Sequence, residues 1–145
     1  MIGLEELRDR VLGRELAGGT WTPLDYEAWL AADAMLAPPP QDGAMHPMMV
    51  FHATVRAVAY TIGELFELFD CPLEDGPMLG EMDLHQHRPL QVGETYAVQP
   101  TIVDVVRKEG RSGTFDLIAT EFVVRGDDGE PAATLRNTYV CPRRA

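Results

Sequence analysis

The first half of the chain places apolar residues at helical spacing, whereas the second half alternates polar and apolar residues. In the first half, apolar residues recur every three or four positions and predict helices over residues 2–16, 22–36 and about 46–69. Thr22 and Pro23 are typical of a helix start, as a cap and a first helical residue. The helix over 46–69 is the longest, and its wide apolar face consists of Met49, Phe51, Val55, Val58, Ile62, Leu65, Phe66 and Phe69.

After residue 76 the pattern is typical of strands. Four stretches alternate polar and apolar residues and are rich in Val, Thr, Tyr and Phe: residues 78–90, 94–108, 113–126 and 131–144. Turn-forming residues separate them, and Asp127-Asp128-Gly129 is a strong hairpin signal. Helices followed by strands predict an α+β fold, in which one long helix lies on an antiparallel sheet of four strands in succession.

Size, charge and cysteine content exclude several classes of protein. The 145 residues suffice for one domain with one core, and the net charge of −11 argues against electrostatic binding of nucleic acid. Cys71 and Cys141 are too few for a disulfide framework and lack metal-ligand spacing, so we expect free thiols in a reducing compartment. No stretch has the roughly 20 apolar residues that cross a bilayer, and the N-terminus lacks the apolar core of a signal peptide. We therefore expect a soluble, cytoplasmic protein that binds no membrane.

The predicted helix over 46–69 carries two of the four histidines in its first turns. His46 precedes Pro47 at the helix start, and His52 lies on a narrow polar face that also contains Arg56, Tyr60, Glu64 and Glu67. A histidine can act as a general base near neutral pH without a large shift of its pKa. Surface or capping roles for both histidines would explain the same spacing.

Other groups near these histidines could assist proton transfer or bind a substrate. Arg56 lies one turn after His52 and would favour the neutral form of its imidazole. The first-turn amides, including those of Met48 and Met49, are expected to be free and could bind a developing oxyanion. An adaptable apolar pocket could be lined by Met45, Met48, Met49, Phe51, Met78 and Met82.

A pair of histidines also lies in the first predicted strand. His85 and His87 alternate along the strand and share a face with Asp83, so they could contact a divalent ion. The sequence contains no matching cluster that would supply a third and a fourth ligand. A polar strand face, exposed or packed at an interface, explains both histidines more simply, and we expect no metal.

Between residues 43 and 141, the order of several motifs resembles the MaoC-like hydratases and dehydratases, which have the hotdog fold. The matching pieces are Gly43-Ala44-Met45-His46-Pro47, His87-Arg88-Pro89-Leu90-Gln91-Val92-Gly93-Glu94, Gly126-Asp127-Asp128-Gly129-Glu130 and Arg136-Asn137-Thr138-Tyr139-Val140. The resemblance implies a single hotdog domain over residues 1–145, with a helical segment at 1–36 and the hotdog core at 43–141. It also implies a long central helix wrapped by the sheet, and pairing of two subunits that share their sites.

The chain departs from this family at its best-known motif. In the (R)-specific hydratases, a Gly-Asp-x-Asn-Pro-x-His signature supplies the Asp and His that hold the catalytic water, and this signature is absent here. Asp33 lies where the family's Asp is expected, and Asp42 precedes His46 by four residues instead of five. A second branch, the β-hydroxyacyl carrier-protein dehydratases and related thioesterases, places an acid on the second turn of the central helix. His52 lies at a similar depth.

From the resemblance we expect an enzyme that reversibly adds or removes water across the α,β bond of an acyl-CoA or acyl-carrier-protein thioester, without a cofactor. His46 or His52 would move the proton, assisted by Asp33 or Asp42. The substrate would contact Met48, Met49, Arg56, Tyr60 and Arg88. Two alternatives stay open: a thioesterase, or a non-catalytic subunit that binds an acyl chain or completes an active partner. We expect a homodimer or a heteromer with another hotdog subunit.

Overall fold

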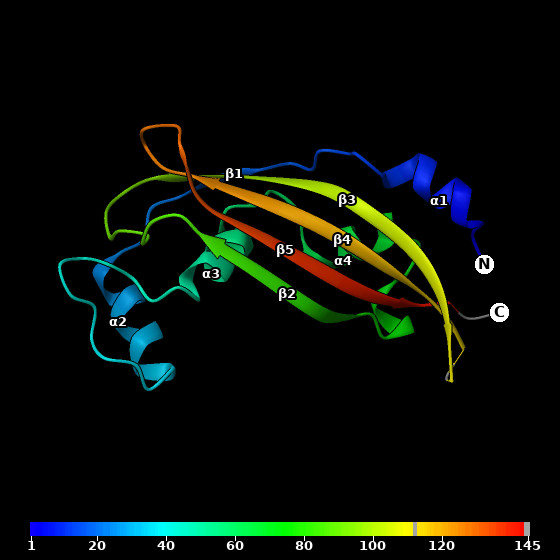
Figure 1. Ribbon diagram of the computed structural model, residues 1–145, viewed down its shortest axis with the longest axis horizontal. Coiled ribbons are helices and arrows are strands. Elements are labelled where there is room, and N and C mark those ends of the chain that lie inside the picture. Colours follow the sequence, from blue (N-terminus) through cyan, green and yellow to red (C-terminus); the bar gives the residue numbers. More distant parts are fainter. Residues whose placement is uncertain (112, 144–145) are drawn as a thin grey trace.

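The computed structural model describes residues 1–111 and 113–143, which form a five-stranded antiparallel sheet with helices packed on it (Figure 1). The strands are β1 (Gly19–Trp21), β2 (Met78–Gln86), β3 (Tyr96–Gly110), β4 (Gly113–Arg125) and β5 (Pro131–Pro142). The helices are α1 (Leu4–Val11), α2 (Asp25–Ala34), α3 (Met49–Arg56) and α4 (Ile62–Leu68), with a 3₁₀ turn, η1, at Leu73–Asp75. The predicted α+β class is confirmed, and α3 and α4 lie on one face of the sheet.

The sheet order is β1-β3-β4-β5-β2. The hairpin predicted at Asp127-Asp128-Gly129 joins β4 to β5, with a hydrogen bond from the Gly126 amide to the Glu130 carbonyl (3.1 Å) and a positive φ of 77° at Gly129. All four predicted strands are present, but their predicted succession is wrong, because β2 pairs with β5 and not with β3. The hairpin places β4 along one edge of β5. Only the other edge of β5 is then available, and β2 pairs with it.

The short strand β1 was not predicted, since the sequence pattern indicated strands only after residue 76. β1 pairs with the start of β3, and Gly18 makes an isolated bridge to Val58. A Cβ atom on Gly19 would lie 2.7 Å from the Ala57 carbonyl oxygen. Glycine is therefore required here for close approach of two backbones, which is a tertiary reason that local sequence does not reveal.

The predicted helix over residues 46–69 is interrupted. α3 ends at Arg56 and α4 begins at Ile62, and between them the Ala59 amide donates to the Ala17 carbonyl (3.0 Å). Thr61 then caps α4, because its Oγ1 accepts from the Glu64 amide (3.2 Å) while the Glu64 carboxylate accepts from the Thr61 amide (2.7 Å). This capping box is a local signal for a second helix start within an apolar run.

The N-terminal helices are shorter than predicted. α1 covers Leu4–Val11, and α2 begins at Asp25, so Thr22 and Pro23 lie before it. The Thr22 hydroxyl instead shares a hydrogen bond of 2.7 Å with the Thr95 hydroxyl. The Leu24 amide at the start of α2 donates to the Glu27 carboxylate (2.8 Å). Glu27, and not Thr22, therefore supplies the side-chain cap at this end of the helix. No helix among the described residues is long and apolar enough to span a bilayer.

Two buried clusters make up the core. The first packs α3 on one half of the sheet and includes Trp21, Met49, Val50, Leu90, Tyr96, Phe122 and Leu135. The second packs α1 and α4 on the other half and includes Leu7, Val11, Phe66, Phe69, Ile102, Ile118 and Tyr139. The thiols of Cys71 and Cys141 are free and lie in this second cluster, as a buried pair.

A buried ionic network ties the end of α4 to the sheet. Asp116 on β4 is fully buried and accepts hydrogen bonds from Arg107 Nε (2.7 Å) and Arg143 Nε (2.7 Å). Arg143 also donates to the carbonyls of Phe69 and Asp70, just beyond α4. Burial alone would raise the pKa of Asp116, but the two guanidinium groups outweigh it and hold that pKa below its ordinary value.

Candidate functional site

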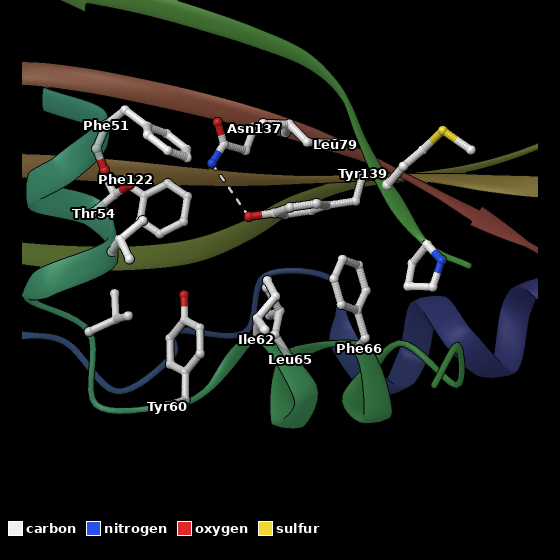
Figure 2. A pocket seen from close by; sticks show the side chains of 14 residues that line it. Phe51, Thr54, Tyr60, Ile62, Leu65, Phe66, Leu79, Phe122, Asn137 and Tyr139 are labelled. Carbon is white, nitrogen blue, oxygen red and sulfur yellow. Dashed lines mark hydrogen bonds between the residues drawn. The ribbon is translucent and has the colours of Figure 1, made fainter. Parts of the chain in front are cut away.

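A cavity of about 280 Å³ lies between the helices α3 and α4 and the sheet, and Figure 2 shows its walls. The helical wall consists of Phe51, Thr54, Val55, Val58, Tyr60, Ile62, Leu65 and Phe66. The opposite wall, from the strands and the segment before β2, consists of Pro77, Met78, Leu79, Phe122, Asn137 and Tyr139. Phe51 and Met78 had been predicted to line an adaptable pocket, whereas Met45 and Met49 belong to the core. Most of the lining is apolar, which suits a hydrocarbon ligand.

The mouth of the cavity is formed by exposed apolar side chains. Val55 is 60% exposed and Ile62 is 53% exposed, although both had been predicted to face the core. Met78 and Leu79, at the start of β2, are exposed as well. The prediction is wrong at Val55 and Ile62 because the helix breaks between them and because β2 is an edge strand, so nothing in the described chain covers this side of α3.

Four polar side chains interrupt the apolar lining, and one of them, Thr54, is bonded to the Phe51 carbonyl of its own helix (2.8 Å). Asn137 Nδ2 donates to the Tyr139 hydroxyl at 3.4 Å, and the Tyr60 hydroxyl points toward the same region of the cavity (Figure 2). Burial raises the pKa of both tyrosines, so both hydroxyls are protonated at neutral pH. Tyr60 had been predicted as a substrate contact on the polar face of one long helix. Because the helix is interrupted between Arg56 and Ile62, Tyr60 lies at the cavity wall instead.

A second candidate region lies on another face of α3, around His52. His52 Nε2 lies 3.8 Å from Glu27 Oε1, and Arg56 Nη2 lies 3.8 Å from the same oxygen. The His52 ring packs edge-on against Trp21, with 5.3 Å between centroids. These separations exceed hydrogen-bond distance, but they place a carboxylate beside the imidazole. Sequence reasoning missed Glu27, whose signal was its position three residues into the start of α2.

The residues proposed around His46 are not brought together as a proton-transfer site. His46 Nδ1 accepts a hydrogen bond from the Met48 amide (3.2 Å), and the Met49 amide donates to the His46 carbonyl (2.9 Å). Both amides that were expected to be free for an oxyanion are therefore occupied. Asp33 and Asp42 are exposed, and among the described residues neither makes an ion pair or hydrogen bond with a histidine.

Arg88, predicted as a substrate contact, is held in an ionic cluster. It donates two hydrogen bonds to the Glu94 carboxylate, which also accepts from the Tyr96 hydroxyl (2.6 Å) and the Asp127 amide (3.2 Å). Arg88 is the main cause that lowers the pKa of Glu94 from 4.5 to about 2. The segment from His87 to Glu94 therefore fastens the hairpin between β4 and β5 to the start of β3.

This cluster predicts a pH-dependent contribution to stability. Because the pKa of Glu94 is lowered in the folded state, its contribution is complete above about pH 4.5 and is lost as the pH falls toward 2. We expect Glu94→Gln to lower the free energy of unfolding by about 2 kcal/mol at pH 7, the scale of charge-assisted hydrogen bonds. Urea unfolding of both proteins from pH 7 to pH 2.5 should show this difference shrinking below pH 4.5. A difference that is independent of pH would contradict the assignment.

His85 on β2 and His87, just beyond its end, do not form a metal site in the described residues. The rings of His85 and His87 contact each other edge to face, with 4.7 Å between centroids. Asp83 is also on β2, but no group of three or more His, Cys, Asp or Glu side chains that could hold a metal is present in residues 1–111 and 113–143. Both histidines are exposed.

Known protein structures share this architecture. The ChsH1-ChsH2 complex from Mycobacterium tuberculosis matches with a TM-score of 0.72 and 17% identity, over 98% of this chain and 90% of that chain. The truncated HadBC (3R)-hydroxyacyl-ACP dehydratase complex from the same organism matches with a TM-score of 0.68 and 15% identity, over 90% and 96%. The R-hydratase PhaJ1 from Pseudomonas aeruginosa matches with a TM-score of 0.63 and 13% identity, over 95% and 86%. At these identities, the likeness concerns the fold.

Family assignment rests on the sequence. No curated protein sequence matches the chain. A family model described as "FAS1-like, dehydratase domain region" matches residues 33–135, which is well over half of the chain. The match includes α3, α4 and β2 to β4, so it covers His46, His52 and the cavity lining except Asn137 and Tyr139. The chain therefore belongs to the FAS1-like dehydratase-region family and has the MaoC-like hotdog fold.

Proposed function

We propose that this chain is a subunit of a hydro-lyase that reversibly adds or removes water across the α,β bond of an acyl-CoA or acyl-carrier-protein thioester. The observation that carries the proposal is the apolar cavity beneath α3 and α4, in a chain of a dehydratase family. Among the proteins of similar fold, HadBC is a (3R)-hydroxyacyl-ACP dehydratase and PhaJ1 is an R-hydratase. The part we assign to this chain is to hold the acyl group.

The cavity has the size and polarity for this part. Its 280 Å³ corresponds to roughly nine water-sized groups, which suits a medium acyl chain or a ring. Each methylene moved from water into such a cavity contributes about 0.8 kcal/mol to binding. None of the described residues that line the cavity carries a formal charge at neutral pH. An uncharged, mostly apolar group is therefore the favoured occupant.

The proton-transfer groups are proposed to come from a second subunit. Dehydration requires a base to take the proton from the α carbon and an acid to protonate the departing β-hydroxyl as water. The described lining of the cavity contains no His, Asp or Glu. His46 and His52 lie outside that lining, and the amides of Met48 and Met49 are occupied within the chain. A complete site thus needs groups that the cavity of this chain does not supply.

The proposed second subunit is another hotdog chain, joined along β2. β2 is the long edge strand of the sheet, and an unpaired edge with exposed apolar residues favours pairing with another strand. Met78 and Leu79 lie both on this edge and at the cavity mouth, beside exposed Val55 and Ile62. A subunit docked there would cover the mouth and could place its own acid and base over the acyl group. The partner is a copy of this chain or a related hotdog subunit.

A second candidate is that this chain carries out the chemistry itself, through His52. The observation that favours it is the Glu27 carboxylate at 3.8 Å from His52 Nε2, where it could orient the imidazole as a general base. Glu27→Gln separates the two roles of this residue, because glutamine retains the helix cap but removes the charge. His52→Ala removes the proposed base.

The two candidates are separated by enzyme assays. Crotonyl-CoA and butyryl-CoA are each incubated with the purified chain and with the assembly purified from the cells in which the chain naturally occurs. The leading proposal predicts loss of enoyl absorbance with the assembly only, and an unchanged rate when the assembly carries His52→Ala. Hydration by the chain alone, reduced at least 100-fold by His52→Ala, would establish the second candidate. Thiol release from butyryl-CoA would indicate a thioesterase, and inertness of both preparations would contradict both candidates.

A further inference from the structure

We propose that the cavity recognises an acyl group that carries a neutral oxygen, a hydroxyl or a ketone, and that Tyr60 and Asn137 hold this oxygen. The inference deepens the proposed function and rests on it in one respect, the identification of the ligand as an acyl group. The recognition of a neutral oxygen rests only on the cavity and can be tested without a thioester.

The first observation is a group of buried polar atoms without hydrogen-bond partners. Among the described residues, the Tyr60 hydroxyl and Asn137 Oδ1 are inaccessible to solvent and have no partner. Asn137 is 2% exposed, and both side chains line the cavity. In Figure 2 the Tyr60 hydroxyl, the Asn137 amide and the Tyr139 hydroxyl point toward one region between apolar walls. They come from the break between α3 and α4 and from β5.

The second observation is a further buried polar atom without a hydrogen-bond partner, on the neighbouring strand β4. Thr120 on β4 pairs directly with Asn137 in the sheet register, so both side chains lie on the same face. Thr120 is fully buried, and its Oγ1 also has no partner among the described residues. Apolar side chains such as Ile102 and Phe122 occupy neighbouring positions on this face. A polar patch has therefore replaced apolar packing at the centre of the sheet.

Energetics favour an occupant for this patch. A buried donor or acceptor without a partner costs about 1–3 kcal/mol, so a core that holds several of them is less stable than one with apolar residues of the same shape. Such groups are uncommon in native proteins, and a functional role or contact with a water or an ion is a usual reason for them. A ligand oxygen that reaches the patch would satisfy atoms that the chain leaves unpaired.

The chemistry of the patch selects a neutral oxygen. Burial keeps the Tyr60 hydroxyl protonated, so it can donate to a ketone or hydroxyl oxygen. The Asn137 amide offers both a donor and an acceptor, and its acceptor could take the proton of a ligand hydroxyl. No charged side chain lies in the described lining to pair with a carboxylate or an amine. A charged ligand group would therefore lose its hydration without compensation.

The test uses a matched pair of small probes, cyclohexanone and methylenecyclohexane. The two differ in the replacement of a carbonyl oxygen by a methylene group, and neither contains a thioester. Dissociation constants for the full chain are measured by NMR titration of backbone amides. We expect Tyr60→Phe to weaken cyclohexanone binding about three- to tenfold, the scale of one hydrogen bond, and to change methylenecyclohexane binding less than twofold. The matched control is Tyr26→Phe, which removes the hydroxyl of an exposed tyrosine outside the cavity and should change neither constant.

A second readout separates a ligand site from a structural role. Because the Tyr60 hydroxyl has no partner in the described chain, Tyr60→Phe should leave the thermal midpoint of the empty protein unchanged or raise it. A lowered midpoint would indicate that the hydroxyl is needed for folding and would overturn the proposal. Equal changes for both probes, no change for either, or failure of the wild-type chain to bind cyclohexanone would also overturn it. Ketone selectivity without any hydratase activity would leave this inference standing and remove the proposed function.

Discussion

Replacing Asp116 with alanine is expected to lower the free energy of unfolding by about 3–5 kcal/mol, the cost of removing one partner from a buried ionic network. Asp116 is fully buried and holds the guanidinium groups of Arg107 and Arg143. Without it, the two guanidinium groups lose the carboxylate between them, and Arg143 keeps only its hydrogen bonds to the Phe69 and Asp70 carbonyls. Urea unfolding followed by circular dichroism at pH 7 measures the loss.

The control for this variant is Asp104→Ala. Asp104 also pairs with an arginine, Arg136, at 3.2 Å, but the two side chains are 49% and 43% exposed. An exposed pair of this kind contributes at most about 1 kcal/mol. Equal losses of unfolding free energy for the two variants would show that burial of the Asp116 network adds nothing to its stabilisation of the fold.

Val55→Trp is expected to weaken binding of octyl-CoA, a thioether that cannot be hydrolysed, on the order of 100-fold. Val55 is 60% exposed at the cavity mouth, so an indole can be placed there with little effect on folding. If the indole excludes about four methylenes from the cavity, at about 0.8 kcal/mol each, the binding free energy of octyl-CoA falls by about 3 kcal/mol. Isothermal titration calorimetry gives both dissociation constants.

The matching control is Leu12→Trp, which adds an indole at another exposed apolar position, outside the cavity lining. Its dissociation constant should equal that of the wild type. If Val55→Trp binds octyl-CoA as tightly as Leu12→Trp does, the acyl chain does not enter through this mouth.

Features set by local sequence were predictable. The alternation of polar and apolar residues located β2 to β5, and Asp127-Asp128-Gly129 located the hairpin, because turn residues and strand periodicity act over a few positions. The pairing of β2 with β5 was not predictable in this way, since it depends on which strand edge is left free. The break between α3 and α4 had a local sign, the Thr61 and Glu64 capping box, which an uninterrupted apolar pattern concealed.

The candidate site depends more on tertiary packing. His52 was identified from its position on the helix, but its carboxylate neighbour is Glu27 and not Asp33, because the packing of α2 on α3 decides which face of α2 meets it. Tyr60 was placed on a polar face that assumed an unbroken helix, whereas the break turns it into the cavity. The buried Asn137 and Thr120 belong to strands whose alternation gave no sign of unpaired polar atoms.

The cavity beneath α3 and α4 is proposed to hold the acyl group of a thioester. A crystal structure of the chain with octyl-CoA would show where the alkyl chain binds. We predict density for the alkyl chain between Phe51, Leu65 and Phe122, with its end beside Tyr60 and Asn137. An alkyl chain bound elsewhere, for example in the hollow around His52 and Arg56, with this cavity empty, would contradict the claim.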